Sequence, residues 1–132
     1  MRFVLPDTNV IIDFLDGDRT FEKELSTAER ILATPSVVAE VMSGISASKK
    51  DKEKKEAFDA FLENAAVEFQ PHDRETAIYY ASIYRHLRMQ GTPIPLGDVW
   101  LAASAMQHGA TILTKDKHFS VIPVIPVVIA EL

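Results

Sequence analysis

The sequence predicts an α/β fold with a short, mainly parallel central sheet. Short β-rich runs occur at residues 2–6, 66–71 and 110–114, and longer segments with helical periodicity separate them. A further strand signal ends the chain at residues 120–130. Strands that alternate with helices are typical of parallel sheets, because each crossover helix returns the chain to the same edge. The length favours one domain, which we place at residues 1–132.

In the N-terminal third, apolar runs alternate with breaks. Residues 2–6 predict a buried strand, and we expect a helix from Thr8 that Gly17 caps. Residues 20–32 are interpreted as a second helix, followed by a short extended segment at "ATPS" (33–36). Apolar residues spaced i, i+3, i+4 and i+7 then predict another helix: Val38, Val41, Met42 and Ile45.

The middle of the chain contains its charge-dense passage, "SASKKDKEKKEAF" (46–58). We interpret it as a solvated connection between helices, and a contact with RNA or a partner is the alternative. The next strand signal, at 66–71, closes at Pro71. A long helix is expected from about Asp73 to Gln90, stopped by Gly91.

The C-terminal third begins with the loop "TPIPLGD" (92–98). Asp98 is expected to open a helix that Gly109 closes. The strand run "ATILT" is followed by a polar turn, "KDKHF" (115–119). Prolines weaken the final strand signal and favour an edge position for it.

Composition excludes several classes of protein. The chain has no cysteine, which excludes disulfides, thiolate metal sites and thiol nucleophiles. We find no signal peptide and no apolar stretch long enough to cross a membrane, so a cytoplasmic protein without membrane contact is expected. The net charge of −5 counts against nucleic-acid binding, unless the acids are concentrated at one site.

Four acids follow predicted strands or lie in the first turns of predicted helices: Asp7, Glu40, Asp98 and Asp116. Each alone has a structural explanation, as a helix cap, a charge favoured by the helix dipole or a turn residue. A capping position needs only an acceptor, however, and all four positions carry an acid. In a parallel sheet they would meet at the carboxyl edge and repel one another. A hard divalent cation, Mg²⁺ or Mn²⁺, would relieve that repulsion.

Three blocks of the sequence resemble, in order and spacing, the signature blocks of PIN-domain ribonucleases. They are "LPDTNVIIDFL", "TPSVVAEVMSGI" and "GTPIPLGDVWLAASAMQHGATILTKDKHF". Within that family they look most like the VapC-type toxins of toxin–antitoxin pairs. The resemblance implies a three-layer α/β/α sandwich. Pro6 departs mildly from the pattern, since an aliphatic residue is more usual there.

The resemblance also implies a function and a site. The chain would be a metal-dependent endoribonuclease, in which one or two Mg²⁺ or Mn²⁺ ions activate water against an RNA phosphodiester. Asn9 matches a residue that orders the first acid, and Thr114 matches a small polar residue beside the last. The expected partners are RNA, an inhibitory antitoxin and a second copy of the chain. The catalytic and metal-binding set would be Asp7, Glu40, Asp98 and Asp116.

Cations near this set are candidates for phosphate contacts, although solvated surface charges are the alternative for each. Lys115 and Lys117 are favoured because they flank Asp116. His118 is interpreted as an incidental turn residue. The weaker RNA-binding candidates are Arg85 and Arg88. Apolar residues that could line an antitoxin groove, or belong to the core, are Phe14, Leu15, Phe21, Leu25, Ile31 and Leu32.

Two rival functions are weighed against the nuclease. One is a PIN-like module that binds RNA or protein without cutting it. The other is a haloacid-dehalogenase-like phosphatase, in which a second aspartate follows the nucleophile by two positions. Here that position is Asn9, so the general acid of such an enzyme is absent.

Overall fold

The computed structural model describes residues 2–123 and 125–130. Its centre is a sheet whose order is β3-β2-β1-β4-β5, and every neighbouring pair of strands is parallel. The predicted α/β class with a parallel sheet is therefore confirmed. The strands are β1 (Phe3–Pro6), β2 (Arg30–Ala33), β3 (Val67–Phe69), β4 (Thr111–Thr114) and β5 (Val127–Ile129).

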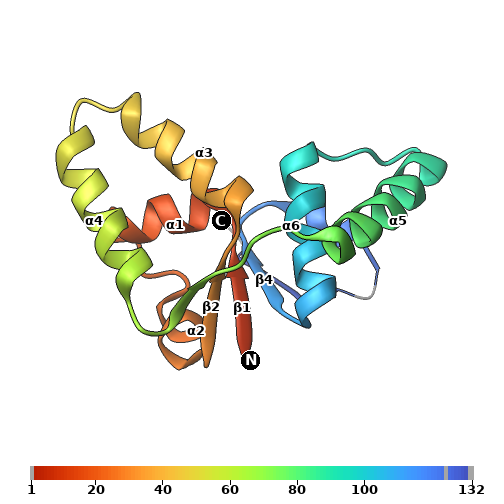
Figure 1. Cartoon of the computed structure of the whole chain (residues 1–132), viewed down its shortest axis with the longest axis horizontal. Coiled ribbons are helices and arrows are strands. Elements are labelled where there is room, and N and C mark those ends of the chain that lie inside the picture. Colours follow the sequence, from red (N-terminus) through yellow and green to blue (C-terminus); the bar gives the residue numbers. More distant parts are fainter. Residues whose placement is uncertain (1, 124, 131–132) are drawn as a thin grey trace.

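Helices cover both faces of the sheet, which confirms the three-layer arrangement (Figure 1). On one side, α1 contacts β4 and α4 contacts β3. On the other side, α6 contacts β1 and β4, and α5 packs against α6. Helix α3 contacts α1, α4 and α6. The helices are α1 (Thr8–Leu15), α2 (Glu22–Thr27), α3 (Pro35–Ser46), α4 (Asp51–Glu63), α5 (Arg74–Gln90) and α6 (Leu96–His108), with a 3₁₀ helix, η1 (Lys117–Val121).

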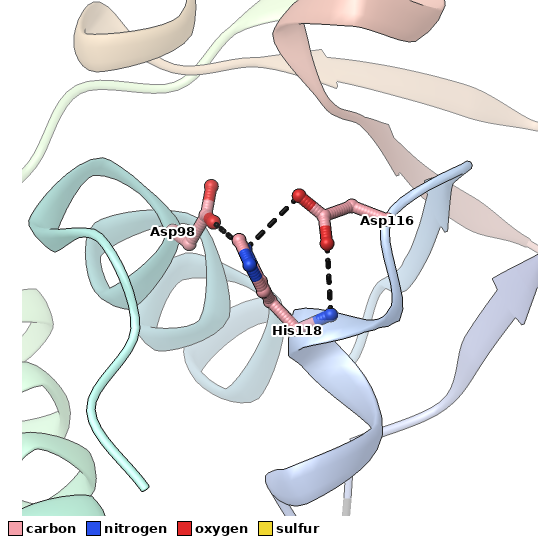
Figure 2. Close-up of side chains that lie close together, drawn as sticks. All are labelled: Asp98, Asp116 and His118. Carbon is pink, nitrogen blue, oxygen red and sulfur yellow. Dashed lines mark hydrogen bonds and ion pairs between the residues drawn. The ribbon is translucent and has the colours of Figure 1, made fainter.

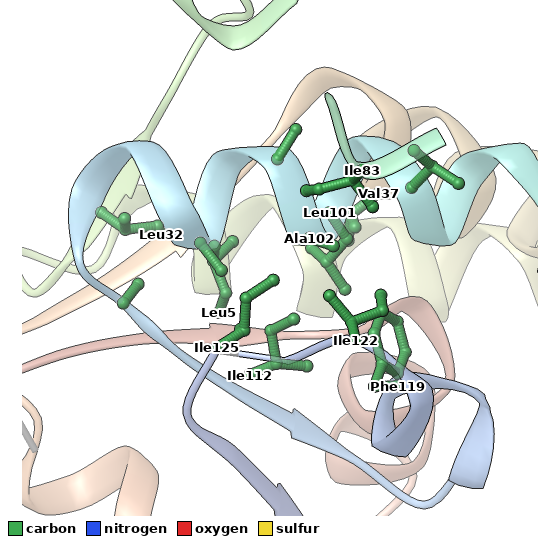
Figure 3. Close-up of a cluster of buried hydrophobic side chains, with 14 of the residues drawn as sticks. Leu5, Leu32, Val37, Ile83, Leu101, Ala102, Ile112, Phe119, Ile122 and Ile125 are labelled. Carbon is green, nitrogen blue, oxygen red and sulfur yellow. The ribbon is translucent and has the colours of Figure 1, made fainter. Parts of the chain in front are cut away.

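Alternation along the strands divides the core in two. Val4 of β1 belongs to a cluster with Phe21 and Leu25, whereas its neighbour Leu5 belongs to a second cluster with residues of α6 such as Leu101. Figure 3 shows the second cluster between α6 and the strands. Successive side chains of a strand point to opposite faces, so a sheet covered on both sides needs apolar residues at every position.

The strand order reverses direction at β1. From β1 the chain builds outward through β2 and β3, and it then returns to place β4 on the other side of β1. Helices after two such neighbouring strands leave in opposite directions and open a crevice at the carboxyl ends of the strands. Asp7 directly follows β1, and Asp116 lies two residues beyond β4, so both acids are at this crevice.

The interpretation of residues 20–32 as one helix is wrong. Helix α2 covers only Glu22–Thr27, and Arg30–Ala33 forms β2. The apolar part of β2 is too short to show a period of two, and the preceding residues are strong helix formers. Pairing with β1, at Phe3↔Arg30 and Val4↔Ile31, makes this segment a strand.

Other boundaries also differ from the sequence-based expectation. The charge-dense passage is mostly helical, since α4 begins at Asp51 and only residues 47–50 form the connection. Helix α6 begins at Leu96, two residues before Asp98, and the polar turn continues into η1. The final strand is confined to β5; Val124, within the expected run, lies outside the described residues. Among the described helices, none has the length and apolar character needed to cross a membrane.

Candidate metal centre

Asp7 is a buried carboxylate at the end of β1. The residue is 8% exposed. Its backbone N–H donates a hydrogen bond to the carbonyl oxygen of Leu113 in β4 over 3.0 Å. Oδ1 accepts from the N–H of Val10 over 3.0 Å, so Asp7 caps α1. Oδ2 accepts a hydrogen bond from the Thr114 hydroxyl. Asp7 thus caps α1 with one carboxylate oxygen, and Thr114 at the end of β4 orients the other.

Thr114 connects the first acid with the last. It is fully buried, and its hydroxyl accepts from the backbone N–H of Asp116 over 2.9 Å while donating to Asp7. Asp116 then caps η1, because its Oδ1 accepts from the N–H of His118 over 2.9 Å. One hydroxyl thus fixes the position of Asp7 relative to the loop that carries Asp116.

Glu40 reaches the same place from α3. The Thr8 hydroxyl donates to Glu40 Oε2 over 2.8 Å and joins the first turn of α1 to α3. The other oxygen, Oε1, lies over Gly97 in the first turn of α6; a Cβ built on that glycine would be 2.5 Å from it. Glu40 is exposed, so these neighbours rather than burial hold its carboxylate.

Asp98 and Asp116 share a histidine neighbour, as Figure 2 shows. His118 Nδ1 is 3.0 Å from Asp116 Oδ2 and 3.3 Å from Asp98 Oδ2. Among the described residues, these three form a group whose potential ligand atoms all lie within 4.8 Å of one another. Two carboxylates and an imidazole at this spacing can hold a metal ion.

The four acids line one small cavity at the carboxyl edge of the sheet. Its volume is about 70 Å³, well below the roughly 300–1,000 Å³ of pockets for organic ligands. The chemistry of the lining suits a hard divalent cation, because carboxylate, hydroxyl and amide oxygens are the ligands that Mg²⁺ and Mn²⁺ prefer. The lining residues are Asp7, Thr8, Asn9, Val37, Glu40, Gly97, Asp98, Leu101 and Asp116.

Burial and mutual repulsion disfavour the charged form of two acids in this cluster. Burial raises the pKa of Asp7, and the negative charges of Asp116 and Asp13 raise it further, against the hydrogen bonds from Thr114 and Val10. Burial likewise raises the pKa of Asp98, with Asp116 and Asp7 adding to the effect and His118 opposing it. A bound cation would reverse both shifts, since it favours the charged carboxylate.

The structure brings some of the other sequence-based candidates to the site and not others. Asn9 lines the cavity, whereas the hydrogen bonds to the Asp7 carboxylate in the described chain come from Val10 and Thr114. Thr114 lies between Asp7 and Asp116 and is hydrogen-bonded to both. Lys117 is exposed beside the last acid, and Arg85 and Arg88 are exposed on α5.

Lys115 pairs with two other acids, Asp13 and Asp18, and not with the four of the cavity. Its ammonium lies 3.0 Å from Asp13 and also pairs with Asp18, and its side chain is only 16% exposed. The hydrogen bond from Lys115 lowers the pKa of Asp18 well below its ordinary value, and the same bond raises the pKa of Lys115. This group fastens the loop after α1 to the end of β4.

Sequence reasoning missed three residues of the site. His118 contacts two acids, although its position in a polar turn gave it the appearance of an incidental residue. Thr8 donates a hydrogen bond to the Glu40 carboxylate, and Gly97 leaves space for it. A glycine in the first turn of a helix, next to an acid, was an available signal for Gly97, because glycine is a poor helix former.

An apolar groove of about 310 Å³ lies between α1, α2 and α4. Of the six apolar residues proposed for groove or core, Phe14, Leu25 and Ile31 line it. Phe21 and Leu32 are buried in the two core clusters, and Leu15 packs against the core from a half-buried position.

Comparisons with known proteins agree with this fold. Residues 4–125 match the family model of the PIN domain, and the chain belongs to that family. Two curated relatives are named as VapC ribonucleases. Ribonuclease VapC2 of Rickettsia felis is 30% identical over 102 residues, which cover 76% of this chain and 75% of the relative. Ribonuclease VapC4 of Mycobacterium tuberculosis is 32% identical over 65 residues, which cover 48% of this chain and 50% of the relative.

Solved structures give the same fold. A chain in the crystal structure of VapBC2 from Rickettsia felis, bound to a DNA fragment from the promoter, superposes with a TM-score of 0.86 at 22% identity. The match covers 98% of this chain and 99% of that chain. VapBC-5 from Mycobacterium tuberculosis, a member of the VapBC family of toxin–antitoxin systems, superposes with a TM-score of 0.72 at 24% identity, with full coverage of both chains.

Proposed function

We propose that this protein is a divalent-metal-dependent endoribonuclease that acts as the toxin of a toxin–antitoxin pair. The observation that carries the proposal is the convergence of Asp7, Glu40, Asp98 and Asp116 on one cavity. These acids come from four separate segments of a PIN-family chain whose relatives are named ribonucleases. Residues 1–132 act as one PIN-like domain in this proposal.

The carboxylates bind and orient one or two Mg²⁺ or Mn²⁺ ions. When bound, such an ion supplies Lewis acidity and a hydroxide nucleophile near neutral pH. Asp7 is the most firmly oriented acid, because Val10 and Thr114 each hold one of its oxygens. Glu40 and Asp98 approach from α3 and α6 and complete the opposite wall. Asp116 closes the cavity from the η1 side. RNA cleavage by this route leaves products with 5′-phosphate and 3′-hydroxyl ends.

Phosphate binding is assigned to exposed cations, one beside Asp116 and two on α5. Lys117 follows Asp116 in the sequence and is exposed, and no described ion pair engages it. Arg88, on α5, borders a groove of about 510 Å³ beside the start of α6. Arg85 is also on α5 and is exposed. Lys115 is the weakest candidate, because a phosphate would have to displace Asp13 and Asp18 from its ammonium.

The antitoxin is the proposed occupant of the apolar groove between α1, α2 and α4. Phe14, Leu25 and Phe61 give this groove an apolar floor, and Arg19 and Glu22 give it a charged rim. Related structures are complexes of VapBC type, which supports an antitoxin partner for this chain. Assembly as a homodimer in the cytoplasm is proposed from the same kinship.

The non-catalytic alternative, a module that binds RNA or protein without cutting it, has less support because all four acids are present. The phosphatase alternative has none left, since the chain belongs to the PIN family and Asn9 occupies the position where that enzyme needs an acid.

The test is cleavage of a mixed RNA pool by the purified full chain with Mg²⁺, with Mn²⁺ and with EDTA. We expect metal-dependent cutting that Asp98→Asn lowers at least about 100-fold. The matched control is Asp59→Asn, which makes the same chemical change on the exposed face of α4 and should cut like wild type.

Two outcomes would oppose the nuclease. If Asp98→Asn cuts as well as wild type, the activity does not come from this site. If folded wild type cuts no RNA in a pool that includes transfer, ribosomal and messenger RNA, while it still binds RNA, the non-catalytic module is the better description.

A further inference from the structure

Gly97 occupies an unusual position for a glycine, in the first turn of α6 directly before Asp98. Glycine is a poor helix former because it loses more backbone freedom on ordering than other residues. Gly91 and Gly109 have a conformational reason to be glycine, since both end helices with positive φ angles of 69° and 64°. Gly97 has no positive φ, so the backbone does not require a glycine there.

The reason lies in the neighbouring side chain. A Cβ on residue 97 would be 2.5 Å from Oε1 and 3.7 Å from Cδ of Glu40. Real Cβ atoms do not approach an oxygen so closely, so a side chain at position 97 would force the Glu40 carboxylate to move. Glu40 is an exposed side chain whose other oxygen accepts a hydrogen bond from the Thr8 hydroxyl over 2.8 Å, so a move away from residue 97 would change or break that bond.

The Glu40 carboxylate therefore sits between Thr8 and the bare backbone of Gly97. Both of these residues, together with Asp98, line the same cavity. Glu40 lies on an exposed part of α3, so burial does not hold its side chain in place. The space at residue 97 and the hydrogen bond from Thr8 together place this carboxylate at the cavity that Asp98 also lines.

We propose that Gly97 is a positioning residue: its missing side chain lets Glu40 and Asp98 face the same divalent cation. The proposal rests on the metal-dependent function argued above. It assigns no contact with the ion to Gly97 itself. It predicts that adding one methyl group at residue 97 weakens metal binding through Glu40, although the same change favours the helix.

The experiment is a double-mutant cycle on Mn²⁺ affinity, measured by calorimetry on the full chain after removal of metal with EDTA. Gly97→Ala should weaken Mn²⁺ binding about 10- to 100-fold, the usual effect of losing an outer residue that orients a ligand. Glu40→Ala should also weaken binding, and Gly97→Ala should add no further loss in that background. The unfolding temperature of each variant is measured in parallel.

Gly44→Ala is the matched control. Gly44 is also a helical glycine, in α3, and its added Cβ would meet Ile12 Cδ1 at 3.6 Å, an ordinary contact. Because Gly44 does not line the cavity, Gly44→Ala should raise helix stability and leave Mn²⁺ affinity unchanged. Should Gly97→Ala fail to fold, the Glu40→Ala/Gly97→Ala double variant should fold, because the obstructing carboxylate is gone.

The outcomes separate the two proposals. If wild type binds Mn²⁺ and Gly97→Ala binds it equally well, the role of Gly97 is overturned and the metal site stands. The role is also overturned if Gly97→Ala weakens binding as much in the Glu40→Ala background as in wild type, or if the double variant stays unfolded. If wild type itself binds no Mn²⁺, the metal-dependent function is overturned and this proposal with it.

Discussion

The hydroxyl of Thr114 donates a hydrogen bond to the carboxylate of Asp7, although the two residues are 107 positions apart. The bond joins the ends of β1 and β4, the two strands between which the strand order reverses. Because the same hydroxyl accepts from the N–H of Asp116, both its donor and an acceptor site are used. The acid pair at the switch point is thus built on a buried threonine.

Replacing Thr114 with valine should therefore destabilise the protein. Valine has nearly the same shape but leaves Oδ2 of the buried Asp7 without its donor and the N–H of Asp116 without its acceptor. The loss of buried hydrogen bonds of this kind costs about 1–3 kcal/mol of unfolding free energy. Urea unfolding of the metal-free protein measures it.

Thr114→Ser is the control for that change, since it keeps the hydroxyl and removes only a methyl group. Serine should retain more of the stability than valine does. If the serine variant is the less stable of the two, packing of the methyl group matters more than the hydrogen bonds, and the role assigned to the hydroxyl is wrong.

Asp98 should make the metal-free protein less stable as pH rises. Its folded-state pKa is raised, first by burial, so between the unfolded and folded pKa values the folded protein holds the proton more tightly. Stability from this group is complete below that window and is lost as pH rises through the folded pKa. Asp98→Asn lacks this loss, so its stability relative to wild type should grow from acidic to neutral pH.

Mn²⁺ should stabilise wild type more than Asp98→Asn at neutral pH. Binding to the folded state stabilises it, and Asp98→Asn binds less tightly than wild type. Thermal unfolding at several pH values, with Mn²⁺ and with EDTA, checks both statements. A constant stability difference across the acidic range would contradict the pKa argument.

Lys115 should contribute to stability rather than to RNA binding. Its ammonium pairs with Asp13 and Asp18, so Lys115→Met leaves two carboxylates close together without a cation. We expect a lower urea midpoint at low ionic strength and a smaller difference in high salt, because screening weakens both the pairing and the repulsion. Equal midpoints of the two proteins at low salt would show that these ion pairs contribute nothing.

Lys117, by contrast, should contribute to RNA binding rather than to stability. Its exposed side chain makes Lys117→Met neutral for stability, but the variant should bind single-stranded RNA more weakly. Loss of one phosphate contact reduces the slope of log affinity against log salt by about 0.7. Fluorescence anisotropy in an Asp98→Asn background, which prevents cleavage, measures the slope; an unchanged slope would remove Lys117 from the RNA-binding surface.

His118 should affect which metals the site prefers. Its Nδ1 lies within 3.3 Å of carboxylate oxygens of both Asp98 and Asp116, and imidazole suits Zn²⁺ and Ni²⁺ better than it suits Mg²⁺. His118→Ala should weaken Ni²⁺ binding more than Mg²⁺ binding in parallel titrations. Equal losses for the two metals would mean that His118 orients the acids without ligating the ion.

The segment at residues 20–33 shows why local patterns left part of the fold undetermined. Helix-forming residues precede a three-residue apolar run, Ile31 to Ala33, and nothing local distinguishes such a run from the buried end of a helix. Its partner is β1, with Phe3 opposite Arg30. By contrast, the long helix α5 was predictable nearly to the residue, because Asp73 caps its start and Gly91 ends it.

The sequence by itself determined the α/β class, the main helices and the four acids, because periodicity, capping residues and acids after strands are local features. The strand order was decided by the tertiary structure, and with it the meeting of Asp7 with Thr114 and Asp116. The pairing of Lys115 with Asp13 and Asp18, the approach of His118 to two acids and the space that Gly97 leaves for Glu40 were decided there too. All of these depend on distances between segments far apart in the chain, and no local pattern of residues encodes such distances.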